Sequence, residues 1–234
     1  SIKLGENINF IGAGAFAECH NLTSIEIPKN VETIGNYVFY LCGNLTSISV
    51  DAQNKRYGSF GNCNAIVDCQ TNTLVAGCKN TTIPDGVTYI GDGCFAGLVI
   101  DSIVIPPSVK GLGSNVFNFS AIATIYCYAP NPPLVNESSL SLPTEPTLYV
   151  PCEALEAYKV HDIWGRFSNI QCIEEDEEEE KTKSYIYYTS SDGNIVNPTN
   201  ANGFDANIIS NTYENGQGII TFDGAVTSIG DNAF

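Results

Sequence analysis

Few residues in this chain of 234 could carry out covalent chemistry. Its two histidines are His20 and His161. Cys19 directly precedes His20, but a thiol activated by a histidine needs a third group to orient the ring, and no such group is visible near this pair. The chain also lacks a G-x-S-x-G elbow, a glycine-rich phosphate loop and an H-E-x-x-H zinc motif. We therefore predict that the protein is not an enzyme.

The cysteines favour packing over metal binding. There are nine, an odd number, and no two form a C-x-x-C pair, which argues against a zinc site. Cys19 and Cys42 occupy equivalent repeat positions, so we favour a ladder of small buried side chains over a disulfide, although the strand spacing of about 5 Å would allow a bridge. Cys63, Cys69 and Cys78 are expected to be structural, with one disulfide among them as the alternative.

The charge distribution excludes several classes of partner. The formal net charge is −16, and residues 174–180 supply seven of the 26 acidic residues. No window offers the clustered Lys and Arg that nucleic acid or an anionic membrane surface requires. The consecutive carboxylates lack the alternate spacing of a calcium loop. We expect no metal, no cofactor, no nucleic acid and no direct insertion into a membrane.

A sequence pattern with a period near 22 residues organises the chain. A shift of 23 aligns the pattern residues Ile11, Gly12, Phe16, Cys19, Leu22, Ile25 and Ile27 with Ile34, Gly35, Phe39, Cys42, Leu45, Ile48 and Val50. The pattern returns at Ile90 and again at Leu112. A fixed period of this length indicates a solenoid, in which each unit is stable only when its neighbours continue the core.

Each unit combines a strand with a tight bend. The segment from Leu22 to Ile27 has the L-x-x-I-x-I spacing of a strand whose Leu and Ile point inward, while Ser24 and Glu26 point outward. Stacked copies would make a parallel sheet. The other half of the unit, V-x-x-I-G-x-x-x-F, places Gly where the chain bends and Phe where a large side chain fills the core. Because they share this repeat position, we predict that four phenylalanines form one stacked column inside the solenoid: Phe16, Phe39, Phe95 and Phe117.

The unit I-G-x-x-x-F-x-x-C-x-x-L-T-S-I-x-I-P resembles the BspA-like branch of the leucine-rich repeats, a family of bacterial surface proteins of the Bacteroides type. The resemblance covers most of the chain. The third unit is irregular, and the fourth is one residue short between Ile90 and Ile103. The resemblance implies an α/β, β-rich leucine-rich-repeat solenoid with a parallel sheet, exposed at the cell surface or secreted, from a gut or oral bacterium.

The third unit contains an insertion. Residues 65–69 and 74–78 are two short apolar runs around a polar turn, which predicts a β-hairpin standing off the stack, within an insertion at about 54–80. The solenoid is expected over residues 1–135, because the prolines from Ala129 to Pro133 cannot continue a ladder.

A cap, a linker and a further module are expected to follow. Residues 136–173 contain a strand at 148–150, a helix after Pro151 and a cluster of large apolar side chains, which would cover the open end of the stack. This arrangement is similar to the element that closes BspA-like repeats. Residues 174–183 form an acidic linker, which we expect to be solvated and cut first by proteases.

Residues 184–234 are predicted to form a short β-hairpin module that leads into the start of a further repeat. We expect one hairpin from 185–188 and 194–196, and another from 208–210 and 219–222. Val226, Ile229 and Phe234 match Ile8, Ile11 and Phe16 at an offset of 218. The half-repeat from Ile219 to Phe234 would carry Phe222, Val226, Ile229 and Phe234 on an inward face that no following strand covers. We predict that it packs against repeat surface of its own or a neighbouring molecule, giving a concentration-dependent homodimer. The chain begins at Ser1 without a leader and is expected to be a mature or excised segment.

Function is expected on the outward face of the sheet. We assign its candidate binding residues from the strand alternation: Ser24, Glu26, Ser47, Ser49, Ser102, Val104, Thr124, Tyr126 and Tyr128. The two tyrosines are favoured, because exposed aromatic pairs contribute strongly to protein interfaces.

The family resemblance implies a surface-exposed protein-binding or adhesion module for a host extracellular-matrix or cell-surface protein, or for a neighbouring cell. Two alternatives are a structural spacer and a protein that binds or processes carbohydrate. The last would need two converging carboxylates in a cleft, and the sequence places no such pair.

Overall fold

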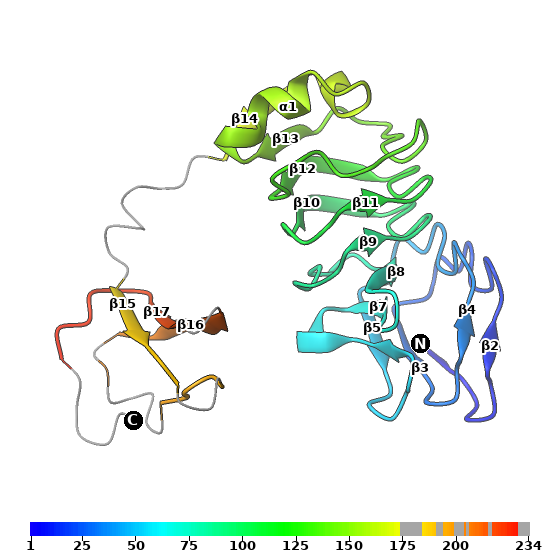
Figure 1. Cartoon of the computed structure of the whole chain (residues 1–234). Coiled ribbons are helices and arrows are strands. Elements are labelled where there is room, and N and C mark those ends of the chain that lie inside the picture. The colour runs from blue at the N-terminus through cyan, green and yellow to red at the C-terminus, as the bar shows by residue number, and fades with distance from the viewer. Residues whose placement is uncertain (174–183, 191–193, 199–203, 205, 215–216, 229–234) are drawn as a thin grey trace. The chain divides into compact units, whose positions relative to one another are not determined.

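The computed structural model describes residues 1–173, 184–190, 194–198, 204, 206–214 and 217–228 (Figure 1). The chain divides into two compact parts, Ser1–Ile173 and Glu174–Phe234, which we call the solenoid unit and the C-terminal unit. The solenoid unit has two clusters of buried apolar residues and the C-terminal unit has a third. The acidic segment 174–183 lies outside the described residues.

The solenoid unit is β-rich and built mainly from short parallel strands, as the repeat predicted (Figure 1). Ile25 pairs with Ile48, and Ile103 with Ile125, so the sequence offsets are also the register offsets. Two parallel sheets carry the L-x-x-I-x-I strands, in the orders β1-β3-β5 and β10-β12-β13-β14. Their strands are β1 (Ile2–Lys3), β3 (Ser24–Ile27), β5 (Ser47–Val50), β10 (Val99–Ile105), β12 (Ala121–Cys127), β13 (Thr147–Val150) and β14 (Ile170–Cys172).

Two further sheets lie along the bends of the units. One pairs β2 (Phe10–Ile11) with β4 (Thr33–Ile34). The other has the order β11-β9-β8-β7-β6. Its strands are β6 (Tyr57–Gly58), β7 (Ala65–Asp68), β8 (Thr73–Gly77), β9 (Tyr89–Ile90) and β11 (Gly111–Leu112), and a short 3-10 helix, η1 (Phe60–Asn62), follows β6.

The inserted hairpin is present, but it does not stand off the stack as predicted. Strands β7 and β8 pair antiparallel, and β8 then pairs parallel with β9. All four residues of β7 are buried: Ile66 packs in the cluster of the first two units, and Val67 in the cluster of the later units. The hairpin lies between the two cores because its strands bury both faces, which alternation alone cannot indicate.

The hairpin is held at its edge by an ion pair between the buried Asp68 and the partly exposed Arg56, which the sequence analysis did not anticipate. Arg56 Nη2 lies 3.0 Å from Asp68 Oδ2, and Arg56 also donates to the Glu32 carbonyl at 2.8 Å. The hydroxyl of Tyr57 accepts a hydrogen bond from the Ile34 amide at 3.0 Å, and burial raises the pKa of this phenol. The insertion is therefore tied to the second unit.

The bends of the second and fourth units touch across the insertion. The Leu41 amide donates to the Ala96 carbonyl at 3.2 Å. Gly93 has φ of +63°, and a Cβ placed on it would lie 2.1 Å from a Tyr37 ring atom. The backbone at the equivalent repeat positions is left-handed in all four regular units. Tyr37 and Leu41 are among the non-glycine residues that adopt this conformation. Glycine at position 93 provides the space that the Tyr37 ring fills.

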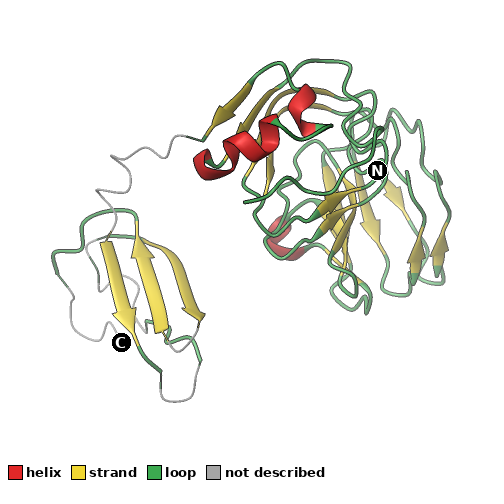
Figure 2. Ribbon diagram, turned by 45° about the horizontal axis from the view of Figure 1, so that its top comes forward, coloured by secondary structure: helices red, strands yellow, loops and turns green. Residues whose placement is uncertain are grey.

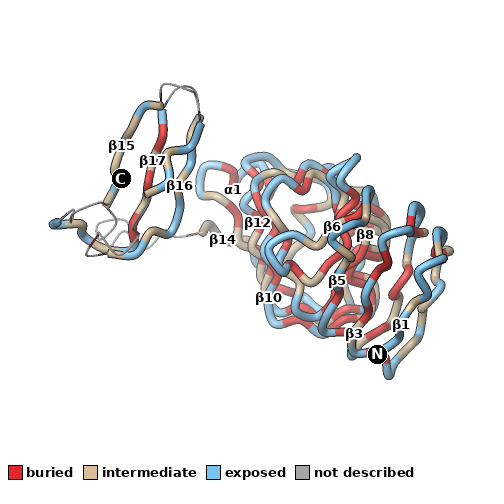
Figure 3. Tube along the Cα trace, turned by 90° about the horizontal axis from the view of Figure 1, so that it is seen from below, coloured by how far each residue is buried: buried red, intermediate tan, exposed pale blue. Residues whose placement is uncertain are grey.

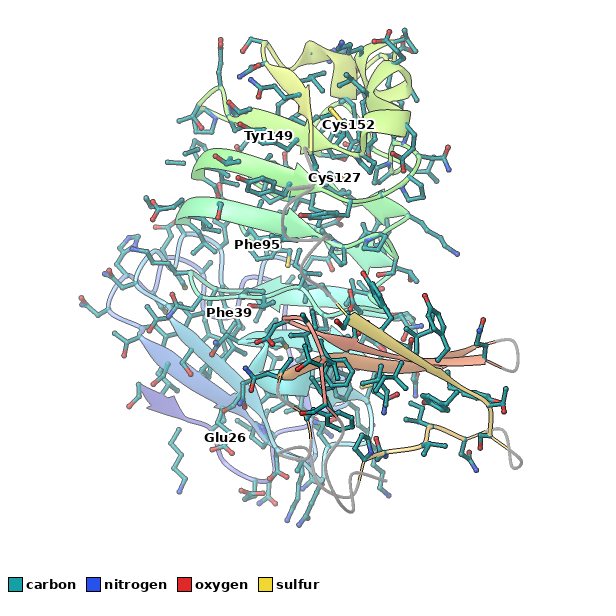
Figure 4. The ribbon with its side chains drawn as sticks, turned by 90° about the vertical axis from the view of Figure 1, so that its left-hand side faces the viewer. Glu26, Phe39, Phe95, Cys127, Tyr149 and Cys152 are labelled. Carbon is teal, nitrogen blue, oxygen red and sulfur yellow. A yellow bond between two sulfur atoms is a disulfide. The ribbon has the colours of Figure 1, made fainter. Side chains whose placement is uncertain are left out.

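The phenylalanine that recurs in each regular unit gives two ring pairs, and the predicted column of four is wrong. Phe16 stacks on Phe39 and Phe95 stacks on Phe117, each at 5.8 Å between ring centroids. Phe39 and Phe95 belong to different core clusters (Figure 4). The inserted hairpin separates the two clusters and interrupts the column.

A helix-containing cap closes the later units (Figure 2). It consists of η2 (Cys152–Ala154), α1 (Leu155–Lys159), η3 (Trp164–Arg166) and strand β14. Tyr158 and Trp164 are fully buried: the Tyr158 hydroxyl donates to the Ala129 carbonyl at 3.0 Å, and Trp164 Nε1 donates to the Pro133 carbonyl at 2.8 Å. These bonds fix the cap to the loop that follows β12.

A disulfide joins Cys152 to Cys172, with the two Cα atoms 4.5 Å apart. It connects the start of the cap to its last strand, and it was not predicted. The other seven cysteines are free thiols. Cys42 is fully buried and its thiol donates to the Phe16 carbonyl at 3.0 Å, in agreement with the predicted ladder of unbridged side chains at Cys19 and Cys42.

The C-terminal unit contains a three-stranded antiparallel sheet in the order β15-β17-β16. The strands are β15 (Ser184–Tyr188), β16 (Ile208–Glu214) and β17 (Gln217–Phe222). The second predicted hairpin is present as β16 and β17. The first is wrong: β15 pairs with the distant β17, and the described residues 194–198 form no strand. Sequence proximity suggested the partner, but β17 is the central strand of the sheet, paired with β15 on one edge and with β16 on the other, and its alternate residues are buried (Figure 3).

The start of the predicted half-repeat belongs to this sheet. Ile220 and Phe222 are fully buried, and Phe222 packs against Phe204 at 4.9 Å between ring centroids. Val226 packs against the same small core. The expectation that Phe222 and Val226 form an uncovered face is therefore wrong, since their own unit covers them. Ile229 and Phe234 lie outside the described residues.

Candidate functional site

The nine predicted binding residues all lie on the outward side of the L-x-x-I-x-I strands or directly after them, but on two separate sheets. Ser24, Glu26, Ser47 and Ser49 lie on β3 and β5. Ser102 and Val104 lie on β10, Thr124 and Tyr126 on β12, and Tyr128 directly follows β12. No strand joins the two sheets, so the predicted continuous row is divided in two.

The N-terminal set is polar and lines a hollow of about 490 Å³. Ser24 is paired with Ser47, and Glu26 with Ser49. Lys3, Glu6 and Asp51 also line the hollow. Asp51 accepts a hydrogen bond from the Gln53 amide at 2.8 Å, and Glu6 lies 3.8 Å from Lys29. This set has the properties of a solvated polar sheet face.

The second set, on β10 and β12, forms part of an aromatic row that continues onto β13. The register pairs Val104 with Tyr126, and Tyr126 with Tyr149. The rings of Tyr126 and Tyr149 stack at 5.0 Å between centroids with an interplanar angle of 18°. Val104 is 48% exposed and Tyr128 is 42% exposed. We call Val104, Tyr126, Tyr128 and Tyr149 the aromatic row.

The sequence analysis missed Tyr149 as a member of this row. It recognised residues 148–150 as a strand but assigned them to the cap, where outward residues were not considered. The signal was the repeat offset itself: Tyr149 follows Tyr126 by 23 residues, and the structure pairs the two. Applying the solenoid register beyond the proline-rich loop would have found the residue.

Neutral polar side chains lie beside the aromatic row. Ser102 pairs with Thr124, and Thr124 with Thr147, one residue pair along the strands. Asn169 donates to the Thr147 hydroxyl at 3.0 Å, and Gln171, which pairs with Tyr149, donates to Asn169 at 3.1 Å. The surface therefore combines aromatic edges with hydroxyl and amide groups, without a charged side chain in either line.

Stacking determines what the aromatic row can contact. Because Tyr126 and Tyr149 cover one face of each other, they offer their ring edges and phenol hydroxyls to a ligand. Such edges carry partial positive charge and interact with carbonyl oxygens or with the faces of other aromatic rings, both of which protein surfaces provide. A sugar ring that packs on a flat aromatic face finds less open area here.

The residues considered for chemistry are not assembled into a reactive group within the described parts of the chain. His20 contacts the Leu41 carbonyl through Nδ1 at 3.1 Å. The Nδ1 atom of His161 accepts from the Ile163 amide at 3.1 Å and from the Trp164 amide at 3.3 Å, so it holds the turn that leads into η3. Among the described residues, no three His, Cys, Asp or Glu side chains converge as metal ligands. No helix in the described parts of the chain has both the length and the apolar character to cross a bilayer.

Strands stacked every 22 or 23 residues, with an outward face that carries the variable side chains, define a repeat scaffold of the leucine-rich type. The family model for the BspA type leucine rich repeat region matches residues 1–80 and 73–132, in six copies, and the chain belongs to this family. A search of curated proteins gives no match.

Solved structures of bacterial leucine-rich-repeat proteins are similar in part. A leucine rich cell surface protein from Faecalibacterium prausnitzii is 21% identical, with a TM-score of 0.46, and the match covers 74% of this chain and 54% of that one. A leucine-rich repeat protein from Eubacterium ventriosum is 22% identical, with a TM-score of 0.44, and the match covers 73% of this chain and 54% of that one. A leucine-rich repeat protein from Bacteroides ovatus is 15% identical, with a TM-score of 0.38, and the match covers 73% of this chain and 54% of that one. The matches thus span about half of each of these longer chains.

Proposed function

We propose that the protein is a cell-surface or secreted adhesion module that binds a host or neighbouring-cell protein through the aromatic row. The single observation that carries the proposal is the line Val104, Tyr126 and Tyr149, which crosses three adjacent strands with Tyr128 beside it. Aromatic side chains on a rigid sheet bind with little loss of conformational freedom and are frequent hot spots of protein interfaces. Membership of the family supports a surface location.

Two further observations support this proposal. The edge-outward stacking of Tyr126 on Tyr149 favours a protein ligand over a sugar ring at this site. The disulfide between Cys152 and Cys172 is compatible with an oxidising compartment, as expected outside the cell. An extracellular-matrix or cell-surface protein is the proposed class of partner. A spacer function would leave the aromatic row without a ligand.

The test begins with a screen of the whole chain against an array of extracellular-matrix and cell-surface proteins. For any protein bound, we expect the double variant Tyr126→Ala/Tyr149→Ala to weaken binding by about 30-fold or more, since hot-spot truncations cost roughly 2 kcal/mol or more. Tyr89→Ala is the matched control, because Tyr89 is 40% exposed on β9, in a different sheet. Equal weakening by the control, or binding unchanged by the double variant, would contradict the proposed site.

A further inference from the structure

The C-terminal unit presents a second aromatic surface, on the side of its sheet away from the small core. The core lies on one side, where Ile186 and Tyr188 pack against the buried cluster of Phe204, Ile220 and Phe222. The alternate residues of β15 are exposed on the other side. The register places Tyr185 beside Thr221 and Tyr187 beside Ile219, with Ser210 and Thr212 on the far strand. We call these six residues the module face: Tyr185, Tyr187, Ser210, Thr212, Ile219 and Thr221.

The two rings of the module face are tilted against each other, whereas the rings of Tyr126 and Tyr149 in the aromatic row are stacked. Tyr185 and Tyr187 lie 6.4 Å apart between centroids, with an interplanar angle of 31°. Tyr187 is 61% exposed, so both faces of its ring cannot be covered. The two rings also line a hollow of about 500 Å³ with Val226, Thr227 and Ser228. The arrangement gives an aromatic platform bordered by hydroxyl groups.

The charge of this unit limits the ligand. Residues 184–234 contain no Lys, Arg or His, so an anionic ligand would find no cation there. Among the described side chains of the unit, the acidic one is Asp223, which accepts two hydrogen bonds from Asn207, at 2.9 and 2.8 Å. These bonds lower the pKa of Asp223. The module face itself is uncharged and matches an uncharged ligand.

We propose that the module face binds a neutral polysaccharide. The C–H groups on one side of a pyranose ring are apolar and weakly positive, so they pack against the electron-rich face of an aromatic ring. The hydroxyls around the sugar ring can bond to the neutral side chains of Thr221, Thr212 and Ser210. Aromatic contact area with a few placed polar groups is the usual composition of a small-ligand site. This second site is separate in chemistry and in sequence from the aromatic row.

The proposal is tested by affinity electrophoresis of the whole chain in gels containing a soluble mixed-linkage β-glucan, xyloglucan or a galactomannan, and by pull-down on cellulose. We expect retardation by at least one neutral polysaccharide. Tyr185→Ala/Tyr187→Ala should weaken binding at least tenfold, and the single variant Tyr187→Ala should weaken it as well. Tyr187→Phe keeps the ring and should bind like the parent chain. Circular dichroism confirms that each variant is folded.

The controls separate this site from the proposed protein-binding site. Tyr126→Ala/Tyr149→Ala should leave polysaccharide binding unchanged, and the module variants should leave binding of a protein ligand unchanged. Three outcomes overturn the proposal: no neutral polysaccharide retards the chain, a folded alanine variant binds like the parent, or the chain binds only the anionic probes heparin and polygalacturonate.

Discussion

Phe39 shows what one repeat position contributes to stability. Its ring is buried and stacks on Phe16 of the preceding unit. We predict that Phe39→Ala lowers the free energy of unfolding by about 3–5 kcal/mol, because the change removes buried area and leaves a cavity. Phe10→Ala is the control, since Phe10 is 63% exposed, and it should change stability far less. Denaturant titration of both variants provides the measurement, and similar losses would refute the assigned core position.

Buried thiols should make the free energy of unfolding depend on pH in the alkaline range. Burial raises the pKa of Cys78, Cys94 and Cys127 above the usual value for a thiol. Above about pH 8.5 an unfolded thiol loses its proton while the buried thiol keeps it. The unfolded state then binds fewer protons, and stability falls as pH rises.

We therefore predict a melting temperature that is nearly constant from pH 7 to 8 and decreases between pH 8.5 and 10. Cys94→Ala should make this decrease less steep, because it removes up to about 1.4 kcal/mol per pH unit from the pH dependence of the free energy of unfolding, whatever the variant does to stability at neutral pH. Calorimetry with a short exposure to alkaline buffer measures both curves. Parallel curves for the two chains would show that Cys94 does not contribute.

At the scale of elements, the contact between the second and fourth bends depends on a missing side chain. Gly93→Ala would place a Cβ 2.1 Å from the Tyr37 ring. The matched control is Gly61→Ala: Gly61 has φ of +58°, close to the +63° of Gly93, but nothing lies within 4 Å of its Cβ position. Both variants carry the cost of a left-handed alanine, roughly 1–2 kcal/mol. The clash is specific to Gly93.

We predict that Gly93→Ala destabilises the solenoid unit by at least about 1 kcal/mol more than Gly61→Ala does. Adding Tyr37→Ala to Gly93→Ala should recover part of the difference, since it removes the ring that the new methyl group meets. Equal losses for the two glycine variants, measured by chemical denaturation, would mean that the Tyr37 ring can move away without cost.

The cap provides a second prediction for an element. Trp164 is the only tryptophan in the chain and is fully buried in the cap, so its fluorescence reports cap unfolding. The double variant Cys152→Ser/Cys172→Ser should have a free energy of unfolding about 2–4 kcal/mol lower than that of the parent chain, which is typical for removal of a disulfide. A reductant should also lower the free energy of unfolding of the parent chain, and it should leave that of the variant unchanged. A shift in the variant would implicate the free thiols.

The elements also show what the sequence could and could not predict. The offsets of 23 and 22 residues became the registers of Ile25 with Ile48 and Ile103 with Ile125, because a repeat stacks on itself by equivalent positions. The integration of Ile66 and Val67 into two cores was missed, because a strand buried on both faces has no alternation to reveal it.

For the candidate sites, the outward direction of side chains could be predicted from the sequence, but the pairing of distant strands could not. Strand alternation gave the outward positions of Tyr126 and Val104 correctly, since side-chain direction follows from the pleat. Tyr149 was missed because its strand is separated from β12 by a long proline-rich loop. The pairing of β15 with β17 depends on contacts between distant residues, and a pattern read along the chain favours the neighbouring segment instead.

At the scale of the whole molecule, the two compact units have separate cores. We predict that ending the chain at Ile173 changes the free energy of unfolding of the solenoid unit, followed by Trp164 fluorescence, by no more than about 0.5 kcal/mol, since the two units share no core residues and should contribute additively. Sedimentation of the same two chains tests the proposed homodimer through the C-terminal half-repeat. That proposal expects a concentration-dependent dimer for the full chain and a monomer for the shorter one, and two monomers would refute it.

The bridge between Cys152 and Cys172 has a mechanical consequence for a solenoid pulled along its chain. Tension that enters at residue 173 passes through the sulfur atoms into β13, because the disulfide is the shortest covalent path. The segment 153–171 carries no load, and roughly 65 Å of contour length, at about 3.4 Å per residue, cannot be drawn out. With the bridge intact the cap is a tether of fixed length, and with the bridge reduced it becomes an extensible one.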